Sequence, residues 1–212
     1  LQATYSDPRA LFKREELPPD TKFDPWGVGR SHRPDCWHMS HMHHPLEGAD
    51  VPLDEILNYP APRNVSEYLP QLTPGVKDVM AQGWATMGSM ACTIWEGSWY
   101  LRSMEDLMSD MMMDDERATA LLDMVTDNEV ERIKLYAQAN CDIVQLGDDI
   151  GMQQTIMMSL DLWRTWLKPR LKKVIDAGRA VKPDLLVFYH SCGYVIPFLD
   201  ELIEIGVDIL NP

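Results

Sequence analysis

The second half of the chain alternates apolar strands with amphipathic helices, and this alternation limits the fold more than any other feature. The stretch 141–149, "CDIVQLGDD", reads as an apolar strand that ends in carboxylates, and 184–193, "DLLVFYHSCG", reads as another. Between them, 159–181 gathers its large apolar residues on one helical face. Near-continuous apolar strands that alternate with helices are typical of a parallel sheet covered by helices. An open doubly wound sheet and a (β/α)8 barrel both fit this order.

The length of this region decides how much of a barrel it can form. A full (β/α)8 barrel takes about 250 residues, whereas the whole chain has 212 residues and its regular pattern begins only near residue 76. We count at most four strand–helix units, with 76–85 as the first strand and 207–212 as the start of the last. We therefore expect residues 76–212 to form the first half of a (β/α)8 barrel, truncated at the C-terminus.

Residues 1–75 differ in character from the rest of the chain. Pro and Gly recur every few residues there, and no helical period survives except a single turn at 53–57. Frequent Pro and Gly residues are typical of loops and turns. We expect a loop-rich N-terminal extension with short hairpin strands.

Four helices are predicted between the strands of the second half, and the last is a short helix over 195–206 that is closed by Gly206. Apolar residues at three- and four-residue steps predict one helix over 96–113, and an aspartate cap, Asp114 or Asp115, starts the next. The third covers 159–181, and we expect Pro169 to kink it because proline removes a backbone donor inside a helix.

Composition narrows the classes of partner. The chain is 45% hydrophobic and 25% charged, as ordinary globular proteins are, and has a net charge of −14. We expect no nucleic-acid partner, because phosphates must be met by a basic surface. We also expect no membrane association, since no apolar run approaches the roughly 20 residues that cross a bilayer. Four widely spaced cysteines favour reduced thiols and a cytoplasmic location.

Polar side chains follow two of the predicted strands where packing does not require them. Asp148 and Asp149 end one strand, and His190 and Cys192 end the next. The carboxyl ends of parallel strands meet at one edge of the sheet, where sites form in such folds. Neighbouring residues of a strand point to opposite sides, so one aspartate can face the site while the other caps a helix or binds a backbone amide.

His190 and Cys192 are two residues apart and therefore point the same way along a strand. An imidazole nitrogen and a thiolate sulfur together favour Zn²⁺. Two ligands are fewer than the three that a catalytic zinc usually has. Cys141 begins its strand, so it should lie at the opposite end of the sheet. A hydrogen-bonded histidine and a free cysteine at a strand end remain the alternative.

The segment 35–44, "DCWHMSHMHH", contains more ligand-type residues than the two strand ends, but their spacing is less suited to binding one metal ion. On a strand, His41 and His43 share one side, whereas His38 and His44 share the other. The proline after His44 disfavours a helix there. A partly exposed hairpin is the favoured interpretation, with a metal site as the lesser alternative.

Several stretches resemble the uroporphyrinogen decarboxylase-like superfamily, and most closely its corrinoid-dependent methyltransferase branch. The resemblance is specific in "LGDDIG" and "HSCG" and extends through "LDLWRTWLKPRLKKVI" and "IGVDILNP". It is more diffuse in "DPWGVG", "HHPLEG", "LDEILNYPAP" and "IWEGSWYLRSMEDLMSD". The arginine-rich "MRQAGR"-type segment of true uroporphyrinogen decarboxylases has no counterpart here.

The resemblance implies a (β/α)8 barrel and a zinc ion held by an H-x-C pair and a distant cysteine. The pair falls on His190 and Cys192, and the distant cysteine is expected beyond Pro212. The implied activity is methyl transfer between a corrinoid protein and a thiol or other small molecule. Asp148 or Asp149 would then orient His190 or bind substrate.

Three further residues are weaker candidates for contacts with the substrate: Glu96, Arg102 and His44. A corrinoid protein and a small-molecule substrate are the expected partners, and a homodimer stays open. One alternative function is metal-independent decarboxylation of a tetrapyrrole, with an aspartate such as Asp148 stabilising the protonated intermediate. Another is a corrinoid-protein-binding subunit without turnover.

Overall fold

The computed structural model describes residues 3–35, 40–62 and 66–212. The chain divides into two compact units, each built from two segments. The hairpin unit comprises Leu1–Arg63 and Gly97–Met124, and the barrel unit comprises Asn64–Glu96 and Val125–Pro212. Helices α3 (Trp95–Arg102) and α5 (Glu116–Gln138) each contribute residues to both units.

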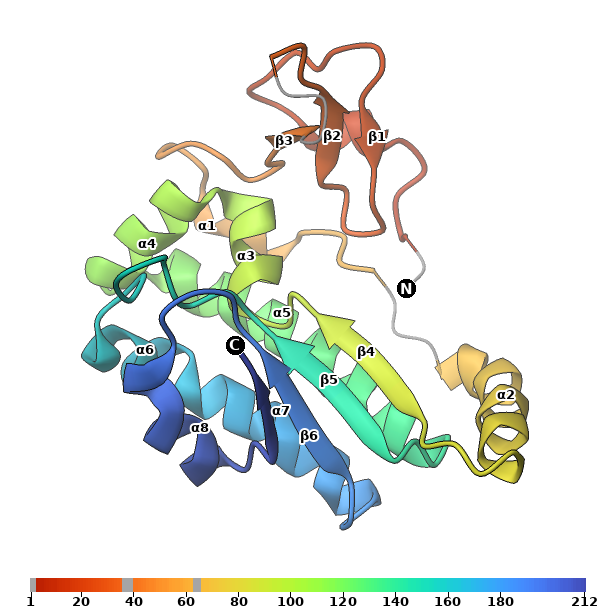
Figure 1. The fold of residues 1–212 in the computed structure, drawn as a ribbon. Helices are drawn as coiled ribbons and strands as arrows, with labels where there is room; N and C mark the ends of the chain where they lie inside the picture. The colour runs from red at the N-terminus through yellow and green to blue at the C-terminus, as the bar shows by residue number, and fades with distance from the viewer. Residues whose placement is uncertain (1–2, 36–39, 63–65) are drawn as a thin grey trace. The chain divides into compact units, whose positions relative to one another are not determined.

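The barrel unit contains a parallel sheet of four strands, added side by side in chain order (Figure 1). Its strands are β4 (Met87–Ala91), β5 (Ile143–Gly147), β6 (Leu186–His190) and β7 (Ile209–Asn211). The register places Gly147 between Ala91 and His190, and His190 beside Asn211. Parallel strands that follow one another in this way form half of a (β/α)8 barrel, as the sequence predicted.

Helices cover one face of this sheet (Figure 1). The ring of Tyr136 on α5 lies over Gly88 of β4, and Ile133 on the same helix packs against Gly178. The remaining helices of the unit are α2 (Leu69–Ala81), α6 (Leu160–Trp166), α7 (Lys168–Val181) and α8 (Leu199–Ile205), with short 3-10 turns at Ser66–Tyr68 and Ile196–Phe198. Alternate strand residues such as Val144 and Val187 are fully buried, as the core side of a sheet requires.

The predicted first strand, 76–85, is wrong. Residues Leu69–Ala81 form helix α2, and the strand begins only at Met87. Val76 is buried against Ala139 and Cys141, and this tertiary packing outweighs the helix-breaking tendency of the proline inside the helix.

Two of the predicted helices are each broken into two. The stretch 96–113 divides at Ser103, because the φ of this residue is 72° and lies outside the helical region. The Ser103 hydroxyl accepts a hydrogen bond from the Asp106 amide and so caps the start of α4 (Met104–Met112). The stretch 159–181 divides at Leu167. Pro169 lies in the first turn of α7, where a backbone N–H would have no acceptor within the helix, so the proline removes no helical hydrogen bond. The helix predicted from the aspartate cap is confirmed as α5.

The hairpin unit holds an antiparallel sheet, β1 (Lys22–Phe23), β2 (Gly29–His32) and β3 (Ser40–His43), and loops connect these strands. It also contains a 3-10 turn at Pro8–Leu11 and helix α1 (Leu53–Leu57), the predicted single turn. Among the described residues, no helix is long and apolar enough to span a membrane.

Candidate metal centre

Three ligand-type side chains meet at the carboxyl ends of β5 and β6. Asp149 follows β5, His190 is the last residue of β6, and Cys192 lies two residues further on. One donor atom from each lies within 4.8 Å of the others. The Cys192 Sγ atom is 3.3 Å from His190 Nε2, and Asp149 Oδ1 is 3.9 Å from the same nitrogen. We call these three residues the strand-end cluster.

The imidazole of His190 is held in one tautomer. Its Nδ1 atom lies 3.0 Å from the backbone carbonyl oxygen of Asn211 and 2.9 Å from the Asn211 side-chain oxygen. A carbonyl oxygen can only accept, so Nδ1 carries the proton and donates it. The lone pair of Nε2 is therefore directed toward Cys192 and Asp149, which is the arrangement of a metal-binding histidine with an outer partner.

Asp149 is fixed by the backbone around it. Its Oδ1 atom accepts a hydrogen bond of 2.7 Å from the amide of Cys192, and its own amide donates to Glu96 Oε2 at 3.2 Å. Gly193 makes the turn after Cys192 possible. Its φ is +83°, and a Cβ atom there would lie 2.6 Å from the Met152 carbonyl oxygen.

Asp148 points the other way and is buried, with 4% of its surface exposed. Its carboxylate accepts hydrogen bonds from the amides of Ile94 and Glu96, at 3.1 and 2.9 Å, at the start of α3. Burial raises the pKa of Asp148 to about 8, against the effect of these amide donors. The two adjacent aspartates thus have separate surroundings: Asp148 anchors a helix start, and Asp149 faces His190.

The charge of Asp149 has a direct effect on the neighbouring thiol. It is the main cause that raises the pKa of Cys192, an exposed residue. Without a bound cation, the thiol therefore keeps its proton at neutral pH. A metal ion would reverse this, because a coordinating thiol is deprotonated.

The donor set fits a zinc ion. Zinc bonds of about 2.3 Å to sulfur and about 2.0 Å to nitrogen, at a tetrahedral angle, put the two ligand atoms about 3.5 Å apart. The observed separation of 3.3 Å between Cys192 Sγ and His190 Nε2 needs only a small side-chain adjustment. With Asp149, the chain offers one nitrogen, one sulfur and one oxygen ligand.

The weaker substrate candidates lie in three different settings. Glu96 adjoins the strand-end cluster through the Asp149 amide. Arg102 is 1% exposed, and its guanidinium donates to Asp110 at 3.0 Å and to the carbonyl oxygens of Leu46 and Gly48. These bonds leave Arg102 little surface for a substrate. All three residues stay predictions as substrate contacts, His44 included.

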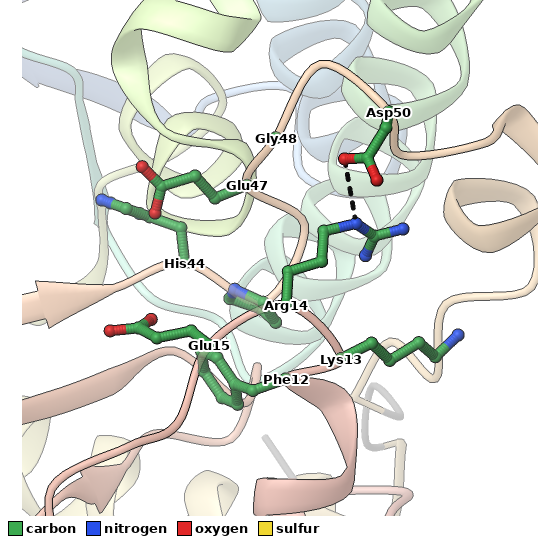
Figure 2. Close-up of a pocket in the computed structure, with 9 residues that line it drawn as sticks. Phe12, Lys13, Arg14, Glu15, His44, Glu47, Gly48 and Asp50 are labelled. Atoms are coloured by element: carbon green, nitrogen blue, oxygen red, sulfur yellow. Dashed lines mark hydrogen bonds and ion pairs between the residues drawn. The ribbon is translucent and has the colours of Figure 1, made fainter.

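His44 lines a pocket of about 360 Å³ in the hairpin unit (Figure 2). Its Nδ1 atom lies 2.8 Å from the carbonyl oxygen of Tyr100. The same pocket is lined by Arg14, which is paired with Asp50. Cys141, which was considered as a third zinc ligand, is buried beside Val76 in the core. Cys36 and His38 lie outside the described residues.

Sequence reasoning missed Asn211 and the role of Asp149 as a candidate ligand. Asn211 is the last residue of β7 and is the register partner of His190. Its position at the end of a predicted strand was the one feature of the sequence that could have indicated it. Asp149 was expected to orient His190 or bind substrate. Its approach to Cys192 depends on the loop after β5, which strand periodicity does not describe.

Comparison with known proteins identifies the family. The model of the family described as uroporphyrinogen decarboxylase (URO-D) matches residues 55–212, which is more than half of the chain. A solved structure of a methyltransferase from Methanosarcina mazei is similar in fold, with a TM-score of 0.57 and 20% identity over 82% of this chain. The chain spans 49% of the length of that methyltransferase. No curated protein matches significantly. The chain is therefore a member of the uroporphyrinogen decarboxylase family.

Proposed function

We propose that the chain is the site-bearing half of a zinc-dependent methyltransferase, which moves a methyl group between a corrinoid protein and a thiol or another small molecule. The observation that carries this proposal is the strand-end cluster, with a thiol, an oriented imidazole and a carboxylate within 4.8 Å. Its position at the carboxyl ends of barrel strands is where (β/α)8 enzymes have their active sites. The similarity in fold to a methyltransferase supports the same reaction class.

His190 and Cys192 would hold the ion, and Asn211 would keep His190 Nε2 available to it. Zinc bound there would supply Lewis acidity that lowers the pKa of a substrate thiol. Asp149 would be the third ligand from this chain, or would give up its place to the cysteine expected beyond Pro212. Asp148 would hold the start of α3 beside the site through the amides of Ile94 and Glu96.

The reaction balances as a displacement at carbon. The substrate thiol would lose its proton to solvent, and its sulfur would form a bond to the methyl carbon as the carbon–cobalt bond of the partner's corrinoid broke. Both electrons of that bond would stay on cobalt, so Co(III) would become Co(I). The proposed partners are a corrinoid protein and a small-molecule substrate such as a thiol, and the proposed location is the cytoplasm, where thiols are kept reduced.

The first test is metal content. The purified protein and its His190→Ala and Cys192→Ser variants are loaded with Co²⁺, which reports sulfur ligation through a charge-transfer absorption in the near ultraviolet. We expect this absorption in the parent protein and its loss in both variants. A Cys141→Ala variant is the matched control, because Cys141 is a buried thiol outside the cluster, and it should keep the absorption. An unchanged spectrum in Cys192→Ser would rule out the ligand assignment.

The second test is turnover. The protein is given methylcobalamin and a small alkyl thiol, and the loss of the methyl–cobalt absorption is followed with and without zinc. We expect zinc-dependent transfer that is lost in Cys192→Ser and retained in Cys141→Ala. Metal-independent CO₂ release from uroporphyrinogen would instead support a decarboxylase. Binding of a corrinoid protein without any transfer would support a non-catalytic subunit.

A further inference from the structure

A second group of ligand-type side chains lies in the hairpin unit. Glu15 comes from the loop before β1, and His41 and His43 come from β3. One donor atom from each lies within 4.8 Å of the other two. The Nδ1 atom of His43 is 2.6 Å from Glu15 Oε1, and the two imidazole rings meet edge to face with their centres 4.5 Å apart. We call these three residues the hairpin cluster.

The antiparallel sheet explains why both histidines point to the same place. His41 and His43 are two residues apart on one strand, so their side chains share a face. Gly29 on β2 stands opposite His43, and a Cβ atom at Gly29 would lie 3.2 Å from the Cβ of His43. The glycine thus leaves room for the imidazole, which is buried with 3% of its surface exposed.

Ser31 orients the buried ring. It is 5% exposed, and its Oγ atom lies 2.8 Å from the Nε2 of His43. The Glu15 carboxylate can only accept, so Nδ1 donates to it and the Ser31 hydroxyl donates to Nε2. Because a hydroxyl can also accept from a ring N–H, Ser31 would let Nε2 carry the proton when Nδ1 binds a cation. Histidines that bind metals almost always have such a partner for their other nitrogen. Ser31 can thus occupy the second nitrogen of His43 as Asn211 does for His190, but unlike a carbonyl oxygen it does not by itself fix the tautomer.

An ion pair between His43 and Glu15 accounts for only two of the three side chains. It leaves His41, an exposed residue on a strand, with its ring held against that of His43. A cation at the centre accounts for all three, because it needs donors that converge from separate segments. In that state the Glu15 oxygen and His43 Nδ1 would move apart from 2.6 Å to about 3.4 Å, as bonds of about 2.0–2.2 Å to one ion require.

The ligand chemistry selects the class of ion. Two imidazole nitrogens and one carboxylate oxygen suit zinc and its neighbours among the divalent transition metals. Mg²⁺ and Ca²⁺ prefer oxygen ligands and fit poorly. We propose that Glu15, His41 and His43 bind a divalent transition-metal ion of the zinc class, which ties the loop before β1 to the hairpin. Its three residues differ from those of the strand-end cluster, and none of the three is a cysteine.

The test measures Co²⁺ and Zn²⁺ binding in a Cys192→Ser background, which removes the thiol of the strand-end cluster. We expect the ion to bind with visible cobalt transitions but without sulfur charge-transfer absorption. Metal should also raise the melting temperature, because a ligand that binds only the folded state stabilises it. His41→Ala and Glu15→Gln should each weaken binding by at least about 10-fold, a loss typical even of outer-shell changes.

His32→Ala is the matched control, since His32 is an exposed histidine of the same sheet outside the hairpin cluster. It should bind as the background protein does. His41 and Glu15 are exposed, so their variants should keep the far-ultraviolet circular dichroism of the parent. Equal affinity in the background protein, His41→Ala and Glu15→Gln would overturn the proposal, and so would an equal loss in His32→Ala. Should one variant unfold, the other alone decides the outcome.

Discussion

The strand-end cluster and the hairpin cluster have a similar arrangement of side chains in two different parts of the fold. Each takes a pair of ligand-type residues two positions apart, on β3 in the hairpin cluster and at and just beyond the end of β6 in the strand-end cluster. Each also adds a carboxylate from a loop. Each also has a polar neighbour that occupies the other nitrogen of one histidine, Asn211 in one case and Ser31 in the other. A short i, i+2 pattern becomes a candidate metal site only when a third segment and an orienting partner meet it.

The differences between the two clusters are chemical and positional. The strand-end cluster contains a thiol and lies where parallel barrel strands end, whereas the hairpin cluster offers only nitrogen and oxygen on an antiparallel sheet. Sulfur suits the activation of a thiol substrate, and barrel strand ends are where catalysis occurs in this fold. We therefore propose a catalytic role for the strand-end cluster and a structural role for the hairpin cluster.

The largest expected effect separates the two clusters by their sulfur ligand. Cys192→Ser should weaken metal binding at the strand-end cluster by more than about 100-fold, because a direct ligand matters more than the outer partners, whose loss costs about 10- to 100-fold. The hairpin cluster should keep its affinity. Competition titrations with a metal-binding dye, read as two classes of site, provide the measurement. Loss of both classes together would mean that the sites are not independent.

The next effect tests how closely the strand-end cluster depends on the sheet. A Cβ atom at Gly147 would lie 2.6 Å from the backbone oxygen of His190, so the neighbouring strand must move. Gly147→Ala should lower the free energy of unfolding by about 2 kcal/mol, as overpacking usually does, and should weaken sulfur-ligated metal binding. Chemical denaturation and cobalt spectra measure the two effects. Gly75→Ala is the control, because a Cβ atom at Gly75 meets nothing within 4 Å.

A smaller effect tests the orienting partners. Asn211→Ala should weaken the strand-end cluster, and Ser31→Ala the hairpin cluster, each by about 10-fold or about 1.4 kcal/mol. Each change should leave the other cluster unaffected. Asn211→Ala retains one acceptor for His190 in its backbone carbonyl, at 3.0 Å, so its effect should be the weaker of the two. The reverse order would show that the Asn211 side chain, not its carbonyl, fixes the tautomer.

Sequence periodicity was enough to predict the parallel half-barrel. The closeness of His190 and Cys192 also depends on the chain after β6, because that strand ends at His190. Apolar strands carry a period of two, and that period is local. The prediction from periodicity was wrong at α2, where the buried contacts of Val76 decide the structure. It was also wrong at Ser103, because no residue pattern indicates the positive φ of that residue. It also missed Asn211, because the contact between β6 and β7 joins residues 21 positions apart.

The hairpin histidines also show that strand periodicity does not predict contacts between residues far apart in the sequence. The pattern indicated that His41 and His43 share a face of a strand, but a metal site was the lesser interpretation because the four histidines do not share one face and the segment precedes the predicted barrel. Glu15 lies 28 positions before His43 and reaches it only through the folding of the loop. Spacing predicts pairs, whereas the third ligand depends on tertiary structure.

The last prediction concerns pH and a carboxylate beside the strand-end cluster. Asp148 is buried, whereas Glu15 of the hairpin cluster is exposed. The pKa of Asp148 is about 8 in the folded protein and about 4 in an unfolded chain. As the pH rises above about 4, the unfolded chain releases this proton while the folded protein keeps it, so folding stability falls until the pH passes about 8. Asp148→Asn removes this titration and should also cost a constant amount for the weaker anchoring of α3.

The measurement is the free energy of unfolding of both proteins at several pH values in this window. The deficit of Asp148→Asn should shrink by about 1 kcal/mol for one unit of rising pH, near the limit of about 1.4 kcal/mol that one proton allows. Glu129, whose pKa burial raises to about 7, is present in both proteins, so its contribution cancels. Parallel stability curves would mean that the amides of Ile94 and Glu96 keep Asp148 ionised in the folded protein. The strand-end region would then rest on a buried negative charge, which would add to the attraction of a cation to Asp149 and Cys192.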